Sequence, residues 1–207
     1  MPNGANCLIE PGNLVHATGF IVGARSGLMT GIAADADVYA LRNPSPKPIR
    51  VPAIKLAWVT TVAASADPLL GFALHKVTGF SAIHSGGAPL TVSAATLLRN
   101  AGHIALAQGS AATNDFDCRI ADAGAMSTAT YDATSANNGR PFDMVAAEPG
   151  MTPSAANVAP SLNYVWRPED GLPLVLDQNE GIIIRLVATM GTALVGRLFV
   201  GPKCHRS

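Results

Sequence analysis

Apolar and polar residues alternate most regularly between residues 54 and 62. In this stretch Ile54, Leu56 and Trp58 share one side of an extended chain, while a lysine and smaller side chains share the other. A period of two is the pattern of a half-buried β-strand. We therefore expect a strand that carries Trp58 into a hydrophobic core.

Similar patterns predict strands along most of the chain. The 20 glycines and 15 prolines interrupt every window of helical length, and only residues 91–100 are expected to form a short helix. The other expected strands are residues 19–23, 37–42, 70–78, 103–107, 163–166, 172–176, 182–188 and 194–200. Because the strands at 54–62 and 70–78 follow each other closely, we expect them to be neighbours in one sheet.

The best-defined unit lies near the C-terminus. A Gln-Asn-Glu-Gly segment ending at Gly181 separates the strands at 174–176 and 182–188, and its composition is typical of a tight turn. We expect Gly181 to adopt a positive φ, which glycine tolerates without steric cost. A second turn at residues 190–192 leads into the strand at 194–200, so three successive antiparallel strands are predicted.

One of these strands lacks clean alternation, because both of its faces are largely apolar. Ile182 and alternate residues after it can face the core, which leaves Ile183, Arg185 and Val187 on the opposite side. An exposed apolar pair on a regular strand is a poor surface for a monomer. We expect Ile183, Arg185 and Val187 to form a subunit interface, and residues 109–160 are the alternative cover.

Together these elements predict an all-β fold: an antiparallel β-sandwich, jelly-roll-like, with a long irregular loop region. Residues 1–207 are expected to form one domain with an N-terminal arm at about 1–18. Residues 109–160, rich in small and polar side chains, are either a long loop insertion or a set of short strands. The side chains expected to share the core are Trp58, Phe72, Leu74, Ile182, Ile184 and Leu198.

Charge narrows the possible partners. The chain has 14 basic and 14 acidic residues, a net charge of zero, and a charged fraction of 14%, well below the usual value of about 25%. Nucleic-acid binding by phosphate neutralisation needs a basic excess, so it is not expected. The apolar stretch at 181–201 contains Arg185 and Arg197, each costing about 3 kcal/mol near a bilayer centre, so no membrane span is expected. A weakly charged, neutral chain favours association.

The sequence contains no motif for catalysis, cofactor binding or metal binding. Cys7, Cys118 and Cys204 lack zinc-site spacing, and the five histidines lack the HxH and HExxH patterns. The acidic residues between Asp115 and Asp122 do not continue the pattern of a calcium loop. We therefore expect no enzymatic activity, no cofactor and no required metal.

Several blocks of the sequence resemble a group of virion-associated proteins encoded by tailed bacteriophages. These blocks are residues 74–81, 85–91, 172–185, 191–192 and 198–200. The resemblance implies a structural particle component with a β-sandwich fold, and it carries over no catalytic residue. Residues 109–160 lie outside the matched blocks.

The expected function is that of a capsid decoration or cement protein, a structural component of a bacteriophage particle. It would bind the major capsid protein as a homo-oligomer, with a trimer favoured by the resemblance, and would reside in the virion after assembly in the host cytoplasm. One alternative is a jelly-roll capsid subunit or a tail or head-fibre component. A further alternative, a carbohydrate-binding β-sandwich, is disfavoured because two Trp and three Tyr offer few rings for sugar stacking.

Overall fold

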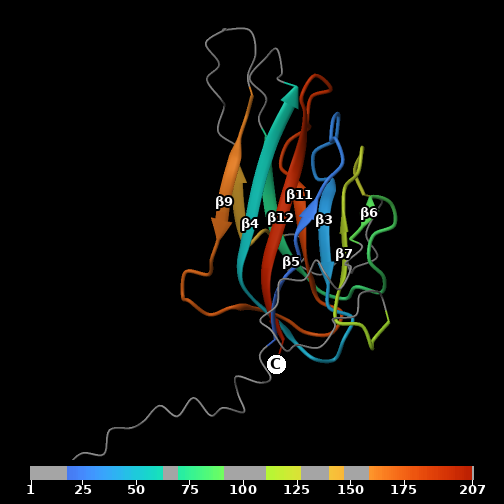
Figure 1. Ribbon diagram of the computed structural model, residues 1–207, viewed down its shortest axis with the longest axis vertical. Helices are drawn as coiled ribbons and strands as arrows, with labels where there is room; N and C mark the ends of the chain where they lie inside the picture. Colours follow the sequence, from blue (N-terminus) through green and yellow to red (C-terminus); the bar gives the residue numbers. More distant parts are fainter. Residues whose placement is uncertain (1–17, 63–69, 91–110, 127–139, 147–158, 207) are drawn as a thin grey trace, which may run out of the picture.

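The computed structural model describes residues 18–62, 70–90, 111–126, 140–146 and 159–206 (Figure 1). These residues form twelve strands in two sheets, all paired antiparallel, and the described part of the chain contains no helix. The predicted all-β antiparallel sandwich is confirmed. Three predicted elements, the N-terminal arm up to residue 17, the helix at 91–100 and the strand at 103–107, lie outside the described residues.

The first sheet, here called sheet A, is built around two long strands. β4 (Ile49–Val62) and β12 (Val195–Arg206) pair antiparallel along most of their lengths and lie at the front in Figure 1. The shorter strands are β1 (Thr18–Ile21) and β2 (Ala24–Arg25) beside β12, and β9 (Leu162–Trp166) and β10 (Leu174–Leu176) beside β4. Pro52 lies where the pairing of β4 with β12 shifts register, because proline has no N–H to donate and is tolerated at such irregularities.

The second sheet, sheet B, has six strands. Their order is β6 (Ala88–Pro89), β7 (Asp117–Ile120), β3 (Asp37–Arg42), β11 (Gly181–Leu186), β5 (Gly71–Val77) and β8 (Asp143–Ala146). Two of them, β7 and β8, come from residues 109–160. That region is therefore not one irregular loop, and the alternative of short strands holds for its described part.

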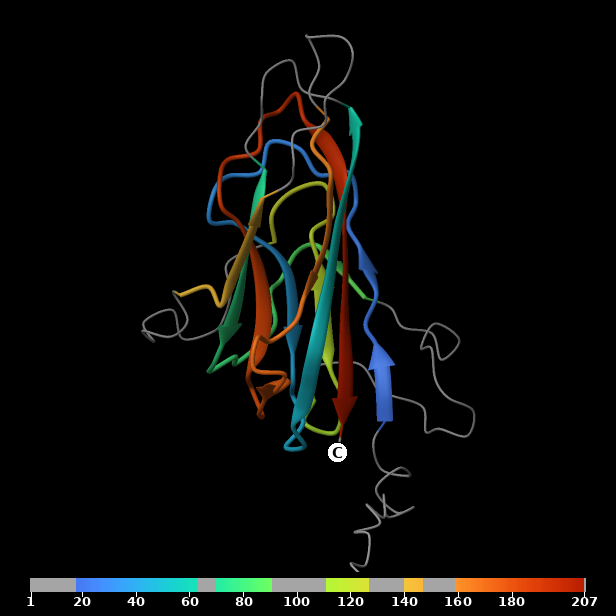
Figure 2. The same ribbon diagram turned by 90° about the vertical axis from the view of Figure 1, so that its left-hand side faces the viewer.

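The core lies between the two sheets, which Figure 2 shows as separate layers. Trp58 of β4 faces Phe72 of β5 across the sandwich, with ring centroids 6.2 Å apart. All six side chains predicted to share the core are at most 2% exposed and belong to one cluster. Burying each of them stabilises the fold by about 1.5 to 3 kcal/mol.

The pairing predicted between consecutive strands is wrong in two places. β4 and β5 lie in different sheets, and β10, β11 and β12 alternate between sheet A, sheet B and sheet A. The turn at residues 177–180 carries the chain across the sandwich, and the Glu180 N–H donates to the Asp177 carbonyl within it. Turn chemistry of this kind does not distinguish a hairpin from a connection between sheets. The jelly-roll-like topology stays a prediction.

The expected positive φ at Gly181 is also wrong. The left-handed residue of this turn is Asn179, with φ 62°, and Gly181 begins β11 between two paired strands. A Cβ at Gly181 would lie 2.2 Å from the carbonyl oxygen of Leu41 and 2.6 Å from Cε2 of Phe80. Glycine is required here by a lack of space rather than by backbone conformation.

Candidate functional site

Of the three predicted interface residues, Ile183 and Arg185 lie on the side of β11 that faces away from the core, and Val187 directly follows the strand. Ile183 is fully buried within the chain, Arg185 is half-buried, and Val187 is 37% exposed. The segment after β5 is tied to this region, because the Phe80 N–H donates to the Asn179 carbonyl at 2.9 Å. The expectation that Ile183 is open to a partner is wrong, since the chain buries this side chain itself. A contact through Arg185 and Val187 stays a prediction.

Arg185 has an ionic partner within the chain. Its Nε lies 2.6 Å from Oδ1 of Asp37, and Nε2 of His84 lies 2.7 Å from Oδ2 of the same carboxylate. The side chain of His84 is fully buried and meets the ring of Phe80 edge-on, at a centroid distance of 6.2 Å. Asp37 thus joins β3, β11 and the segment after β5, which is a structural role.

The outer face of sheet A is an exposed surface with a consistent chemical character. No strand of this sheet contains an aspartate or glutamate. The outward-facing basic residues are Arg25, Arg50, Lys55, Arg197 and Lys203, and we call this surface the basic face. Because the chain as a whole is neutral, its acidic residues are concentrated elsewhere.

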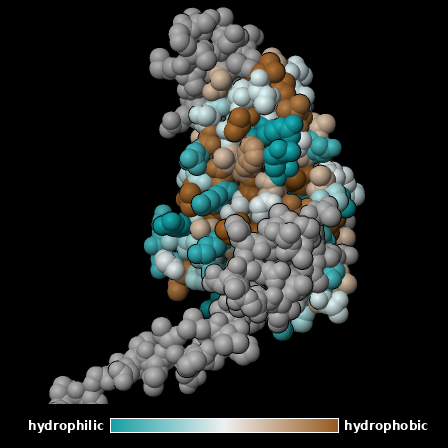
Figure 3. Space-filling model, viewed as in Figure 1, coloured by the Kyte–Doolittle hydropathy of each residue, from teal (hydrophilic) through white to brown (hydrophobic). Residues whose placement is uncertain are grey.

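Exposed apolar side chains lie between these basic groups. Val59, Val165 and Phe199 are 51%, 40% and 37% exposed, and register places them on the same outer side as Lys55. In Figure 3, which is viewed from this side, hydrophobic and hydrophilic residues are interspersed over the described surface. Interfaces between separately folded proteins have such a mixed composition, as do other protein surfaces.

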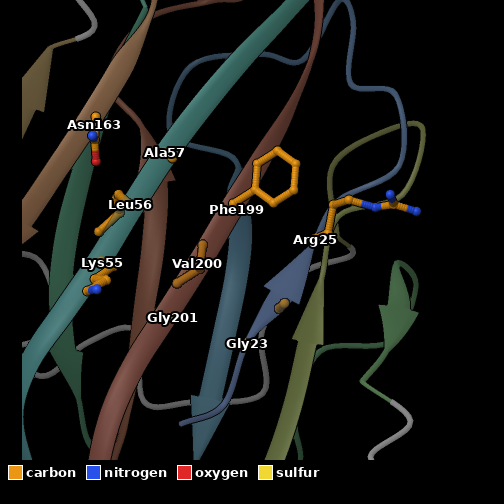
Figure 4. A pocket seen from close by; sticks show the side chains of 10 residues that line it. Gly23, Arg25, Lys55, Leu56, Ala57, Asn163, Phe199, Val200 and Gly201 are labelled. Carbon is orange, nitrogen blue, oxygen red and sulfur yellow. The ribbon is translucent and has the colours of Figure 1, made fainter. Parts of the chain in front are cut away.

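A shallow hollow of about 420 Å³ opens in the basic face around Phe199. It is lined by small residues, including Gly23, Ala57 and Gly201. Figure 4 shows the ring of Phe199 standing out from β12, with Arg25 of β2 on one side and Lys55 of β4 on the other. The ring of Phe199 can therefore insert into a pocket of a partner protein, while a side chain of the partner fills the hollow beside it.

Reactive chemistry is not favoured at the two described cysteines. Cys118 and Cys204 are free and fully buried. Burial raises the pKa of Cys118 to about 12 and also raises the pKa of Cys204, so both stay protonated and poorly nucleophilic at neutral pH. Cys7 lies outside the described residues.

The expected absence of a metal site can be examined only where the structure describes the chain. Among those residues, no three His, Cys, Asp or Glu side chains gather in a way that could hold an ion. Asp115, a possible calcium ligand in the sequence, instead forms an ion pair, in which its Oδ1 lies 3.2 Å from Nη1 of Arg206. The described residues also contain no helix long and apolar enough to cross a membrane.

The basic face was missed by sequence reasoning although its signal was present. The segments that become β4 and β12 carry basic residues and no acidic ones, but this matters only once the two strands are known to pair. Comparisons with family models, with curated proteins and with solved structures return no match to this chain.

Proposed function

We propose that this protein is a structural component of a bacteriophage particle and attaches to the capsid shell through the basic face of sheet A. The observation that carries the proposal is the combination of exposed Val59, Val165 and Phe199 with basic neighbours on a sheet that has no acidic residue. Exposed apolar side chains ringed by charge mark interaction surfaces. That the particle is a bacteriophage is proposed from the blocks of sequence that resemble virion proteins.

The charge of the face defines the chemistry of its partner. Arg25 and Lys55 lose hydration when a partner covers them, and this loss is offset only if the partner supplies acidic groups. The partner surface on the capsid protein should therefore place carboxylates around an apolar centre that receives Phe199. Homo-oligomerisation, with a trimer as the expected form, belongs to the same proposal and is supported by the low charge of the chain.

The first experiment asks whether the chain is part of a particle. Particles purified from the phage whose genome encodes this chain are analysed by mass spectrometry, and the position of the gene relative to portal, protease and capsid genes is noted. The chain should be present in stoichiometric amounts. Its absence from the particles would refute the proposal.

The second experiment tests the face. Particles lacking the chain are mixed with wild-type protein, with the double variant Lys55→Glu/Phe199→Asp, and with Met144→Asp as a control at an exposed position on β8 of sheet B. The number of copies bound per particle should fall at least about tenfold for the double variant. Lys55→Glu reverses one charge of the face, and Phe199→Asp buries a new charge in the contact without a partner. Full occupancy by the double variant would exclude this face as the attachment surface.

A further inference from the structure

A second hollow lies at one edge of the sandwich, where β9 of sheet A lies against β8 of sheet B. Figure 2 is viewed from this side of the molecule. The hollow has a volume of about 440 Å³, within the range of about 300 to 1,000 Å³ that small-molecule sites occupy. We call it the edge groove. It is formed by different residues from those of the basic face.

Aromatic rings form one wall of the edge groove. Phe142 and Trp166 lie with their ring centroids 4.9 Å apart and their planes tilted by 59°. Both rings, together with Tyr164, are half-buried and pack against the core on one side, and all three line the groove. Phe199 is the only other described aromatic side chain, histidines aside, that is not buried. The aromatic residues available for stacking are few, but they are gathered in one place.

A carboxylate is held in position beside these rings. The hydroxyl of Tyr164 donates to Oδ2 of Asp143 at 2.5 Å, and the backbone N–H of Met144 donates to Oδ1 at 2.9 Å. The bond to Asp143 raises the pKa of Tyr164 to about 12, so the hydroxyl keeps its proton at neutral pH. A carboxylate has about four acceptor positions, and Asp143 can therefore accept further hydrogen bonds from a ligand.

The rim of the edge groove supplies both acceptors and a donor. Glu169 and Asp170 are exposed, and Oδ1 of Asp170 accepts from the Leu172 N–H at 3.0 Å, which holds the turn in place. Arg167 lies next to them on the same rim. A ligand at this site is offered a stacking surface, several carboxylate oxygens and one guanidinium.

We propose that the edge groove binds a saccharide unit. The C–H face of a sugar ring stacks on an aromatic side chain, here Trp166, and its hydroxyls donate to carboxylates such as Asp143. Its ring and hydroxyl oxygens accept from Arg167. A simple cation would also be attracted by the rings and carboxylates, but it offers no acceptor to Arg167, which also lines the groove. The combination of donor and acceptors favours a sugar.

The test uses the full chain on a printed array of neutral, acidic and amino-sugar glycans. Wild-type protein is compared with Trp166→Ala and with Val62→Ala, a control that trims an exposed apolar side chain outside the groove. Wild type and the control should bind the same glycans. Binding by Trp166→Ala should be weaker by about tenfold or more, as expected when a stacking ring is lost.

Because Trp166 also packs against the core, a second variant separates binding from folding. Glu169→Gln/Asp170→Asn changes two exposed rim residues, keeps the oxygen that accepts from Leu172, and should leave the melting temperature unchanged. It should weaken glycan binding about threefold to tenfold, because charged acceptors form the stronger hydrogen bonds. Affinity is measured by tryptophan fluorescence, in which Trp166 reports on the groove while Trp58 is buried.

Two results would overturn the inference. One is that no glycan on the array binds wild type more tightly than it binds Trp166→Ala. The other is that tetramethylammonium chloride quenches the fluorescence in a salt-sensitive manner while glycans have no effect, which would indicate a cation site. Neither result bears on the basic face, since capsid attachment is tested with different residues.

Discussion

Replacement of Gly181 by alanine tests whether space, rather than backbone conformation, requires glycine at the start of β11. The added Cβ would lie 2.2 Å from the Leu41 carbonyl oxygen and 2.6 Å from Cε2 of Phe80, short of ordinary van der Waals contact by about 1 Å. The Leu41 oxygen belongs to the backbone of β3, so β11 and β3 must move apart. Overpacking of this kind costs about 1 to 3 kcal/mol, and a weakened hydrogen bond adds about 1 kcal/mol. We expect a loss of about 2 to 4 kcal/mol in the free energy of unfolding.

Two other glycines provide matched controls. Gly171 has a φ of 73° and nothing within 4 Å of an added Cβ, so Gly171→Ala should cost only about 1 to 2 kcal/mol of backbone strain. Gly191 has neither a positive φ nor a close neighbour, and Gly191→Ala should have almost no effect. Urea denaturation followed by circular dichroism ranks the three variants. For a chain of this length, each 1 kcal/mol lowers the melting temperature by about 2 to 4 °C.

The reasoning fails if Gly181→Ala is no more destabilising than Gly171→Ala. If Gly181→Ala is the more destabilising change, a double-mutant cycle identifies the neighbour that crowds the added methyl group. In a Phe80→Leu background the contact with Cε2 is absent, and Gly181→Ala should cost less than in wild type by at least about 0.5 kcal/mol. Equal costs in the two backgrounds would show that Phe80 does not contribute to the crowding.

Two further predictions concern the core. Trp58→Ala and Phe72→Ala should each cost about 3 to 5 kcal/mol by urea denaturation, since both rings are buried, and a cost below about 1 kcal/mol would place them on the surface. Burial raises the pKa of Cys118 from its ordinary value of 9.0 to about 12 and also raises the pKa of Cys204. The folded protein therefore keeps both thiols neutral at a pH where the unfolded chain ionises them, so this contribution to stability is complete below pH 9 and is lost as the pH rises. Between pH 9 and pH 11 the free energy of unfolding should fall by up to about 1.4 kcal/mol per pH unit for each thiol, and Cys118→Ala should show a shallower slope than wild type. An equal slope in that variant would contradict the prediction.

The faces of individual strands were predictable because alternation is a local property. Residues 37–42 were predicted as a strand with the bounds that the structure has for β3, and Trp58 points into the core as its spacing indicated. The partner of each strand was not predictable in the same way. Whether the chain after residue 180 returns to its own sheet or crosses to the other depends on contacts with β3 and β5, which are distant in sequence.

The same limit explains why the candidate sites were missed. Phe142 and Trp166 meet only because β8 and β9 lie together at one edge of the sandwich. On the outer face of β11, which Ile183 shares with Gly181 and Arg185, Phe80 lies close to Gly181, and His84 and Arg185 pair with the same carboxylate. Phe80 and His84 come about a hundred positions earlier in the chain. An apolar outer face of a strand predicts that something covers it. It does not indicate whether the cover is another subunit or a segment of the same chain.

The outer face of β11 therefore provides a final test, in which two substitutions should have opposite outcomes. Ile183 is fully buried, and a carboxylate at this position would lose its hydration at a cost of several kcal/mol, a large part of the usual stability of about 5 to 15 kcal/mol. Ile183→Asp should therefore unfold, or melt well below the melting temperature of wild type.

Val187 is 37% exposed, so Val187→Asp should stay folded, with a melting temperature close to that of wild type. If Val187 takes part in a trimer contact, sedimentation velocity should show a lighter species for Val187→Asp, whereas an unchanged mass would remove Val187 from the interface. A folded Ile183→Asp variant with wild-type stability would show that this side chain is not buried by its own chain, and the subunit contact first expected there would again be the better explanation.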